Sequence, residues 1–175
     1  TVKTLCYLSG VSGYEDEVRE YILERAMPYA SSVETDPLGN LIIYKKGAVS
    51  TGRKLMLCAH MDEVGLVVTH IDDDGYLRFG FAGGIDRRVI IGKSVYVGDG
   101  RVPGVIGIKA YHLVTDEEEK KVPKAEEMYI DIGARSRAEA EKLVSLGDAC
   151  VFDDTVVEFG SGYLKAKAID DRLGC

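Results

Sequence analysis

The strongest constraint on the fold is a long stretch of short β-rich runs that are separated by glycine-containing turns. From Leu66 onward, runs rich in Val, Ile, Tyr and Phe replace the helical pattern of the preceding chain. Strands are expected at Leu66–His70, Tyr76–Phe79, Val89–Ile91, Ser94–Val97 and Val102–Ile108. Because the runs are short and closely spaced, with tight turns between them, they predict a small barrel or sandwich.

The residues on either side of this block mix helical and extended patterns. Val2–Leu8 predicts a short helix, and Ser12 with Glu15 predicts a capping box for a second helix, which Pro28 ends. Further strands are expected there at Val33–Thr35, Leu41–Tyr44, Leu55–Ala59 and Tyr163–Ala168, and within the β-rich block at Tyr129–Ile132, Cys150–Phe152 and Val156–Phe159. The run Leu55–Ala59 is entirely apolar, which indicates a buried strand.

The order of these patterns predicts one discontinuous domain and one insert. Residues 1–65 and 160–175 are expected to form an α/β domain, interrupted by an inserted β-barrel domain at residues 66–159. Within the insert, Asp72–Gly75 predicts a solvated hairpin turn and Thr115–Lys124 an exposed loop, because both are highly charged. Ser136, with Glu139 three residues later, predicts the start of a short helix.

The composition narrows the possible partners. The 175 residues carry 22 basic and 29 acidic side chains, a net charge of −7, which argues against a nucleic-acid partner. No apolar run approaches the length that crosses a bilayer, so no membrane association is expected. Among the four cysteines there is no C-x-x-C spacing, and Cys58 and Cys150 lie in apolar runs where they are expected to pack as small hydrophobes. This usage indicates a reducing cytoplasm.

Two clusters of ligand-type side chains stand out. His60 and Asp62 follow the expected buried strand, and their spacing directs both side chains to the same side of an extended backbone. A carboxylate in that position can orient an imidazole that binds a metal. His-x-Asp alone is a weak signal, and a purely structural histidine is the simpler alternative. A second acidic cluster, Asp170-Asp171, follows another strand-like run.

The order and spacing of several motifs resemble one family. Ala59-His-Met-Asp-Glu-Val-Gly65, followed much later by Lys167-Ala-Ile-Asp-Asp-Arg172, is similar to the metallo-aminopeptidases that include glutamyl, deblocking and tetrahedral enzymes, some of them labelled endoglucanases. The similarity also covers Gly10–Gly13, Asp36–Asn40, Ile71–Phe79, Gly104–Gly107 and Tyr129–Gly133, and therefore runs over nearly the whole chain.

The resemblance implies a zinc-peptidase-like α/β domain with a dinuclear site for zinc or cobalt. It implies that His60 is a terminal metal ligand, Asp170 the bridging ligand, and Asp62 the carboxylate that orients His60. It further implies a cis peptide bond between Asp170 and Asp171. Arg172 is either an ion-pair partner or a solvated charge. His70 and His112 are expected to have packing, surface or interface roles.

The resemblance also implies that the site is incomplete, since the family's other ligands and general base would follow Cys175. The chain is therefore expected to be the N-terminal half of a cytoplasmic aminopeptidase, inactive by itself. Peptides are the expected substrates, and the family implies dimers through the insert and larger shells up to a dodecamer. The alternatives are a dinuclear metal amidohydrolase and a non-catalytic assembly fragment. The preferred N-terminal residue is left open.

Overall fold

The structure is a computed structural model that describes residues 1–49, 52–153 and 155–175. It divides into two compact units. The discontinuous unit comprises Thr1–Glu63 and Thr155–Cys175, and the barrel unit comprises Val64–Asp154. The strand expected at Val156–Phe159 falls in the discontinuous unit by this division, and the assignment of residues 66–159 to an inserted domain stays a prediction. No helix in the described part of the chain is long and apolar enough to cross a membrane.

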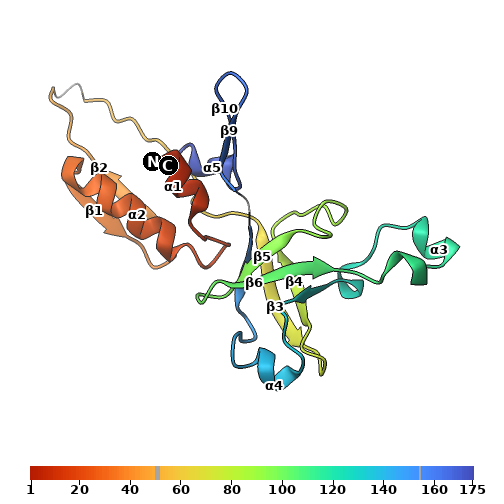
Figure 1. The fold of residues 1–175 in the computed structure, drawn as a ribbon. Helices are drawn as coiled ribbons and strands as arrows, with labels where there is room; N and C mark the ends of the chain where they lie inside the picture. Colours follow the sequence, from red (N-terminus) through yellow and green to blue (C-terminus); the bar gives the residue numbers. More distant parts are fainter. Residues whose placement is uncertain (50–51, 154) are drawn as a thin grey trace. The chain divides into compact units, whose positions relative to one another are not determined.

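The barrel unit contains a closed six-stranded barrel, as the β-rich runs predicted (Figure 1). Its strands, in the order β3-β4-β7-β6-β5-β8 around the barrel, are all antiparallel to their neighbours. The strands are β3 (Gly65–Ile71), β4 (Leu77–Ala82), β5 (Ser94–Val97), β6 (Val102–Gly107), β7 (Tyr129–Asp131) and β8 (Ala149–Phe152). Closure leaves no unpaired edge strand in the barrel.

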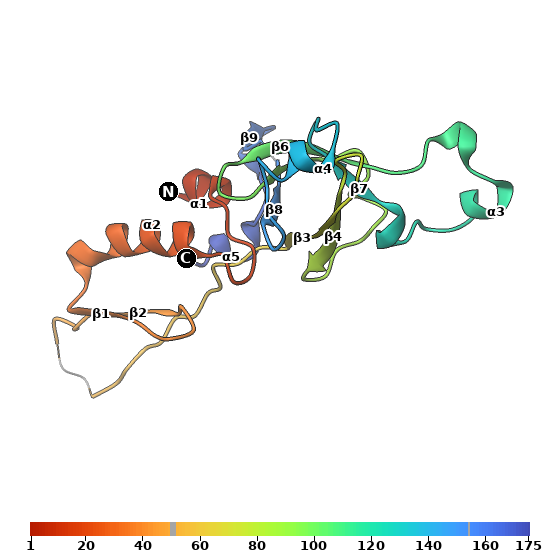
Figure 2. The ribbon, with the colours of Figure 1, turned by 90° about the horizontal axis from the view of Figure 1, so that it is seen from below.

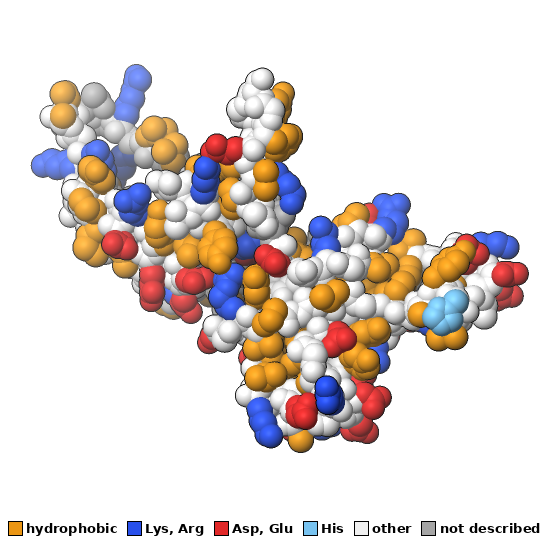
Figure 3. Space-filling view, in the orientation of Figure 1, with side chains coloured by type: hydrophobic (Ala, Val, Ile, Leu, Met, Phe, Trp, Pro, Cys, Tyr) orange, Lys and Arg blue, Asp and Glu red, His pale blue; other side chains and the backbone are white. Residues whose placement is uncertain are grey.

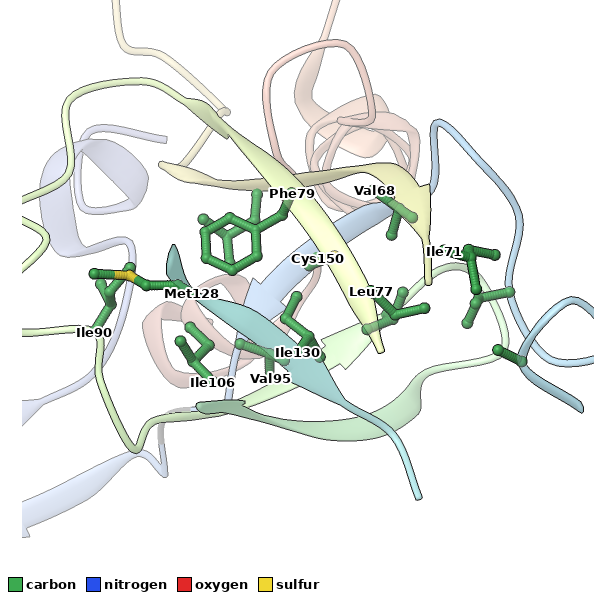
Figure 4. Packing of buried hydrophobic residues seen from close by; sticks show 14 residues of the cluster. Val68, Ile71, Leu77, Phe79, Ile90, Val95, Ile106, Met128, Ile130 and Cys150 are labelled. Carbon is green, nitrogen blue, oxygen red and sulfur yellow. The ribbon is translucent and has the colours of Figure 1, made fainter. Parts of the chain in front are cut away.

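Alternate side chains of these strands fill the barrel interior (Figure 4). Leu66 and Val68 of β3 and Val95 and Val97 of β5 are almost completely buried, as the two-residue period of a strand requires. Cys150 joins this core as the sequence predicted, and burial raises the pKa of its thiol to about 12. A thiol with such a pKa is inert, so Cys150 serves as packing.

The connections of the barrel unit mostly match expectation. Asp72–Gly75 forms the β3–β4 hairpin turn, in which Gly75 N donates to Asp72 O at 3.0 Å. Ser136 caps α4 (Arg137–Ala140) by accepting a hydrogen bond from Glu139 N. The charged stretch is exposed but contains α3 (Asp116–Glu119), flanked by the 3-10 turns η2 (Tyr111–Leu113) and η3 (Ala125–Glu127).

The strand predicted at Val89–Ile91 is wrong. These residues form successive turns, closed by hydrogen bonds from Val89 N to Asp86 O and from Lys93 N to Ile90 O. The turns direct Ile90 into the barrel core, where it is 1% exposed. Ile91 is partly buried and packs against the same core, so the apolar character that indicated a strand reflects core contacts made from a loop.

The discontinuous unit has helices and two separate two-stranded ribbons. Helix α2 packs along the β1–β2 ribbon, and helix α1 lies beside α5 (Figure 2). The elements are α1 (Val2–Tyr7), α2 (Asp16–Ala26), η1 (Met27–Tyr29), β1 (Ser32–Thr35), β2 (Leu41–Tyr44), β9 (Val157–Phe159), β10 (Tyr163–Lys165) and α5 (Ile169–Arg172). The predicted turn between β1 and β2 is held by Asp36, whose carboxylate accepts from Leu38 N and Asn40 N at 2.9 Å each.

The capping box predicted from Ser12 and Glu15 is wrong. Helix α2 begins at Asp16, with Glu15 at the N-cap position and no side-chain cap. The Ser12 hydroxyl instead donates to Asp62, and Glu15 accepts from Gly13 N at 2.9 Å. Ser12, which the local pattern assigned to the helix cap, is hydrogen-bonded to Asp62, a residue distant in the sequence.

The buried strand predicted at Leu55–Ala59 is also absent from this structure. Leu55, Met56 and Leu57 are 83–87% exposed, and Cys58 is exposed as well. The segment has no strand assignment, because a strand needs a hydrogen-bonded neighbour and the described residues offer none here. Hydrophobic side chains consequently lie at the surface of the molecule, as Figure 3 shows for one face.

A buried cluster of charges holds the discontinuous unit together. Arg172 is fully buried and lies 3.5 Å from Glu63, whose carboxylate also pairs with Lys167. The Arg172 guanidinium donates to the carbonyl oxygens of Leu5 and Leu8, at the end of α1, and of Met61. Burial lowers the pKa of Arg172, while the Glu63 carboxylate acts in the opposite direction. Of its two expected roles, Arg172 therefore has that of an ion-pair partner.

Replacing Arg172 should loosen the end of α1. In Arg172→Ala, Glu63 keeps only Lys167, and the carbonyls of Leu5 and Met61 lose their side-chain donor. Removing one partner of a buried ion pair costs about 3–5 kcal/mol. The free energy of opening, measured by native-state amide hydrogen exchange in α1, should fall by that amount.

Lys3→Ala provides the matched control. Lys3 pairs with Glu158 in the same unit, but both side chains are more than half exposed. Solvent-exposed pairs contribute little, so exchange in α1 should not change. Equal effects of the two substitutions would contradict the assigned role of Arg172.

Candidate metal centre

His60 and Asp62 lie on the extended segment that leads to the barrel unit. His60 Nδ1 is 2.9 Å from Asp62 Oδ1, and the two side chains are 54% and 37% exposed. An ionised carboxylate only accepts hydrogen bonds, so Nδ1 carries the hydrogen in this contact. The lone pair of a neutral His60 is consequently on Nε2, the nitrogen that points away from Asp62.

Asp170 meets that nitrogen from the other end of the chain. His60 Nε2 is 3.0 Å from Asp170 Oδ1, although the two residues are 110 positions apart. The peptide bond between Asp170 and Asp171 is cis, as predicted. Asp171 does not share the contact, because its carboxylate accepts from Gly174 N at 3.1 Å.

The charges of the site reinforce one another. The Asp170 contact raises the pKa of His60, burial acts in the opposite direction with a smaller effect, and the hydrogen bond that His60 donates to Asp62 raises the pKa further. The hydrogen bond from the Ser12 hydroxyl holds the pKa of Asp62 below its ordinary value, with a further contribution from His60. Because Nδ1 already carries one hydrogen, the Nε2–Oδ1 contact requires a second proton on the ring. The metal-free pair therefore favours the imidazolium.

The same two atoms are suitable metal ligands. An imidazole Nε2 whose Nδ1–H is held by a carboxylate is the usual arrangement of a histidine that binds zinc. A divalent cation bound by Nε2 and Oδ1 would displace the proton between them. Among the described residues, however, no group of three or more His, Cys, Asp or Glu side chains could hold a metal ion. The donors present thus fit part of a metal site.

The other two histidines do not join this cluster. His70 is on β3, with Nε2 3.7 Å from Asp72 Oδ1, and its side chain is 55% exposed. His112 is on the exposed turn η2. Both belong to the barrel unit, and an interface role for His112 remains a prediction.

Sequence reasoning missed the residues that support the site. Ser12 was assigned to a helix cap, whereas Glu63 and Lys167 received no role, although both lie inside the two motifs that identified the site. Their side chains are 4% and 9% exposed, a burial that charged residues have only when they are paired. A charged residue directly beside a candidate ligand was the available signal.

Substituting Asp170 should lower the pKa of His60. In metal-free Asp170→Asn protein the carboxylate that stabilises the imidazolium is gone, so the pKa should fall toward the ordinary value near 6.5. An NMR titration of the His60 ring measures this. Asp171→Asn is the control, because Asp171 makes no contact with His60, and an equal shift in both variants would contradict the assignment.

Because the pKa of His60 is raised in the folded protein, the stability of the fold depends on pH. The His60–Asp170 contact contributes fully to stability below the unfolded pKa of histidine. This contribution is lost as the pH rises through the higher folded-state pKa. In metal-free wild-type protein the free energy of unfolding should therefore fall as the pH rises over that interval. The fall should be smaller in Asp170→Asn.

The chain is similar to a known protein family and to several known proteins. A model of the M42 glutamyl aminopeptidase family matches residues 39–175. A provisionally named aminopeptidase from Acetivibrio thermocellus is 43% identical over 175 residues, covering 99% of this chain and 50% of that protein. A TET aminopeptidase from the marine sediment archaeon Thaumarchaeota archaeon SCGC AB-539-E09 is 38% identical, with a TM-score of 0.91 and coverage of 98% of this chain and 49% of that chain.

A third similar protein forms large assemblies. The TET1 peptidase of Pyrococcus horikoshii, which assembles into a tetrahedron or a large octahedral shell, is 36% identical, with a TM-score of 0.83 and coverage of 99% and 52% of the two chains. The chain spans about half the length of the curated relatives it matches. The family match includes His60, Asp62 and Asp170. The chain belongs to the M42 glutamyl aminopeptidase family.

Proposed function

We propose that the full-length protein is a metal-dependent aminopeptidase that removes N-terminal residues from peptides at a dinuclear site. His60 and Asp170 are two of its metal ligands, and Asp62 holds His60 in place. The observation that carries this proposal is the 3.0 Å contact between His60 Nε2 and Asp170 Oδ1. It joins the two motifs by which the sequence resembles metallo-aminopeptidases.

The side chains would have different roles in such a site. Two divalent ions, zinc or cobalt, would polarise the scissile carbonyl and lower the pKa of a bound water. Asp62 keeps the Nδ1–H tautomer of His60, so that Nε2 is available as a ligand. The carboxylate of Asp170 is 95% exposed, so both of its oxygens are accessible to ions. Asp171 is held by its own chain at Gly174 and does not compete.

The remaining ligands would come from the part of the full-length protein outside these 175 residues. Two ligands do not complete a tetrahedral site, so the 175-residue chain alone should bind metal weakly and lack activity. The exposed run Leu55–Leu57 also supports a contribution from the rest of the full-length protein, because a contiguous exposed apolar surface usually marks a contact with other protein.

Assembly into homo-oligomers forms part of the proposal. The similar TET1 peptidase forms closed shells, and this chain shares its fold over 99% of its length. We propose that the barrel unit is the insert through which subunits pair, and that larger shells are built from such dimers. Free N-termini of peptides are the substrate, and the preferred first residue must be measured.

The test uses full-length protein that has been stripped of metal and reloaded with Zn²⁺ or Co²⁺. Hydrolysis of a panel of aminoacyl p-nitroanilides should be restored by metal and lost in His60→Ala and Asp170→Asn. Asp62→Asn should lose about 10–100-fold, the usual effect of removing the partner of a ligating histidine. The panel also identifies the preferred first residue.

His70→Ala is the matched control. It removes a half-exposed histidine that also lies beside an aspartate, but in the barrel unit. Its activity should equal that of the wild type. Activity that survives metal removal, or that persists in folded His60→Ala protein, would contradict the proposed function.

A further inference from the structure

Asp62 has a second partner, which the proposed function does not use. Its Oδ1 accepts from His60, and its Oδ2 accepts the hydroxyl hydrogen of Ser12. We propose that Ser12 is a positioning residue of the metal centre, which fixes the Asp62 carboxylate and through it the imidazole of His60. This inference rests on the proposed function, because it assigns Ser12 a role in metal binding by His60.

The backbone places Ser12 beside Asp62. Val11 and Glu63 form a parallel bridge, and Glu63 N donates to Gly10 O at 2.8 Å. The side chains of Val11 and Glu63 are both buried. Because side chains alternate along extended backbone, Asp62 projects to the face opposite Glu63. Ser12 follows Val11 directly and meets Asp62 on that face.

A tight turn keeps Ser12 in this position. Tyr14 N donates to Val11 O at 2.7 Å, which closes the turn that contains Ser12. Gly13 has a φ of +90° in this turn, a conformation that other residues rarely adopt. The hydroxyl therefore reaches Asp62 from a hydrogen-bonded turn.

A second anchor matters because of the geometry of a carboxylate. The last torsion of an aspartate side chain is broad and lacks sharp rotamers. One hydrogen bond from His60 leaves the carboxylate plane free to turn about that torsion. With Ser12 on Oδ2 and His60 on Oδ1, both oxygens are fixed, and so is the direction of the imidazole.

The alternative role of Ser12 is excluded by the start of α2. A serine at this position would ordinarily cap the helix, but α2 begins at Asp16 and its N-cap is Glu15. The Ser12 side chain is exposed, so it contributes no core packing. Its contact with Asp62 is consequently the one described interaction that explains the hydroxyl.

The test measures Zn²⁺ binding to metal-stripped full-length protein by competition with a chromophoric chelator. Ser12→Ala should weaken Zn²⁺ binding about 10-fold, the lower end of the range for outer partners of a metal site. Ser12→Thr should restore binding to within about 2-fold of wild type, because it retains the hydroxyl and the position is exposed. Ser161→Ala, in the exposed turn between β9 and β10, is the control and should bind normally.

The outcomes separate this inference from the proposed function. Wild-type affinity in Ser12→Ala, together with weak binding in His60→Ala, would overturn the role of Ser12 and leave the proposed function standing. Folded Ser12→Thr protein as weak as Ser12→Ala would also overturn it, because the hydroxyl would then be irrelevant. Absence of Zn²⁺ binding by the wild type would overturn both proposals.

Discussion

The buried pairing of Arg172 with Glu63 is the interaction on which the discontinuous unit depends. Glu63 follows the His60–Asp62 segment, whereas Arg172 follows Asp170, so one ion pair holds the two segments in register. The same guanidinium also binds carbonyl oxygens at the end of α1 and at Met61. A buried charge of this kind tolerates little displacement, since every lost contact leaves a desolvated group. The buried cluster therefore fixes the relative positions of the two segments that carry His60, Asp62 and Asp170.

Much of the fold follows from local sequence. The barrel strands were predicted because β-rich runs and glycine-containing turns are properties of neighbouring residues. The same holds for α1, the β1–β2 ribbon around Asp36 and the cap at Ser136. In the candidate site, the spacing of His60 and Asp62 indicated a shared orientation, and the resemblance supplied Asp170 as the third member.

The errors have a different physical origin. The Ser12 hydroxyl has the correct spacing for a cap, but Asp62 lies 50 residues away and takes the hydrogen bond. Leu55–Leu57 has the composition of a buried strand, yet composition does not supply the neighbour that a strand requires. Val89–Ile91 is apolar, yet it is a loop from which Ile90 enters the core and Ile91 packs against it. In each case the presence or absence of a contact with residues distant in sequence decided the outcome.

The closed barrel has a consequence for the order of folding. Its first and last strands are neighbours, with Leu66 opposite Cys150, so the chain enters and leaves the barrel one strand spacing apart. Closing an unfolded loop of this length would cost on the order of 4 kcal/mol in chain entropy. Once the barrel has formed, its own contacts have already met that cost. In a chain whose barrel has formed, the two halves of the discontinuous unit therefore start from neighbouring strand ends, and little further loop-closure entropy opposes their pairing.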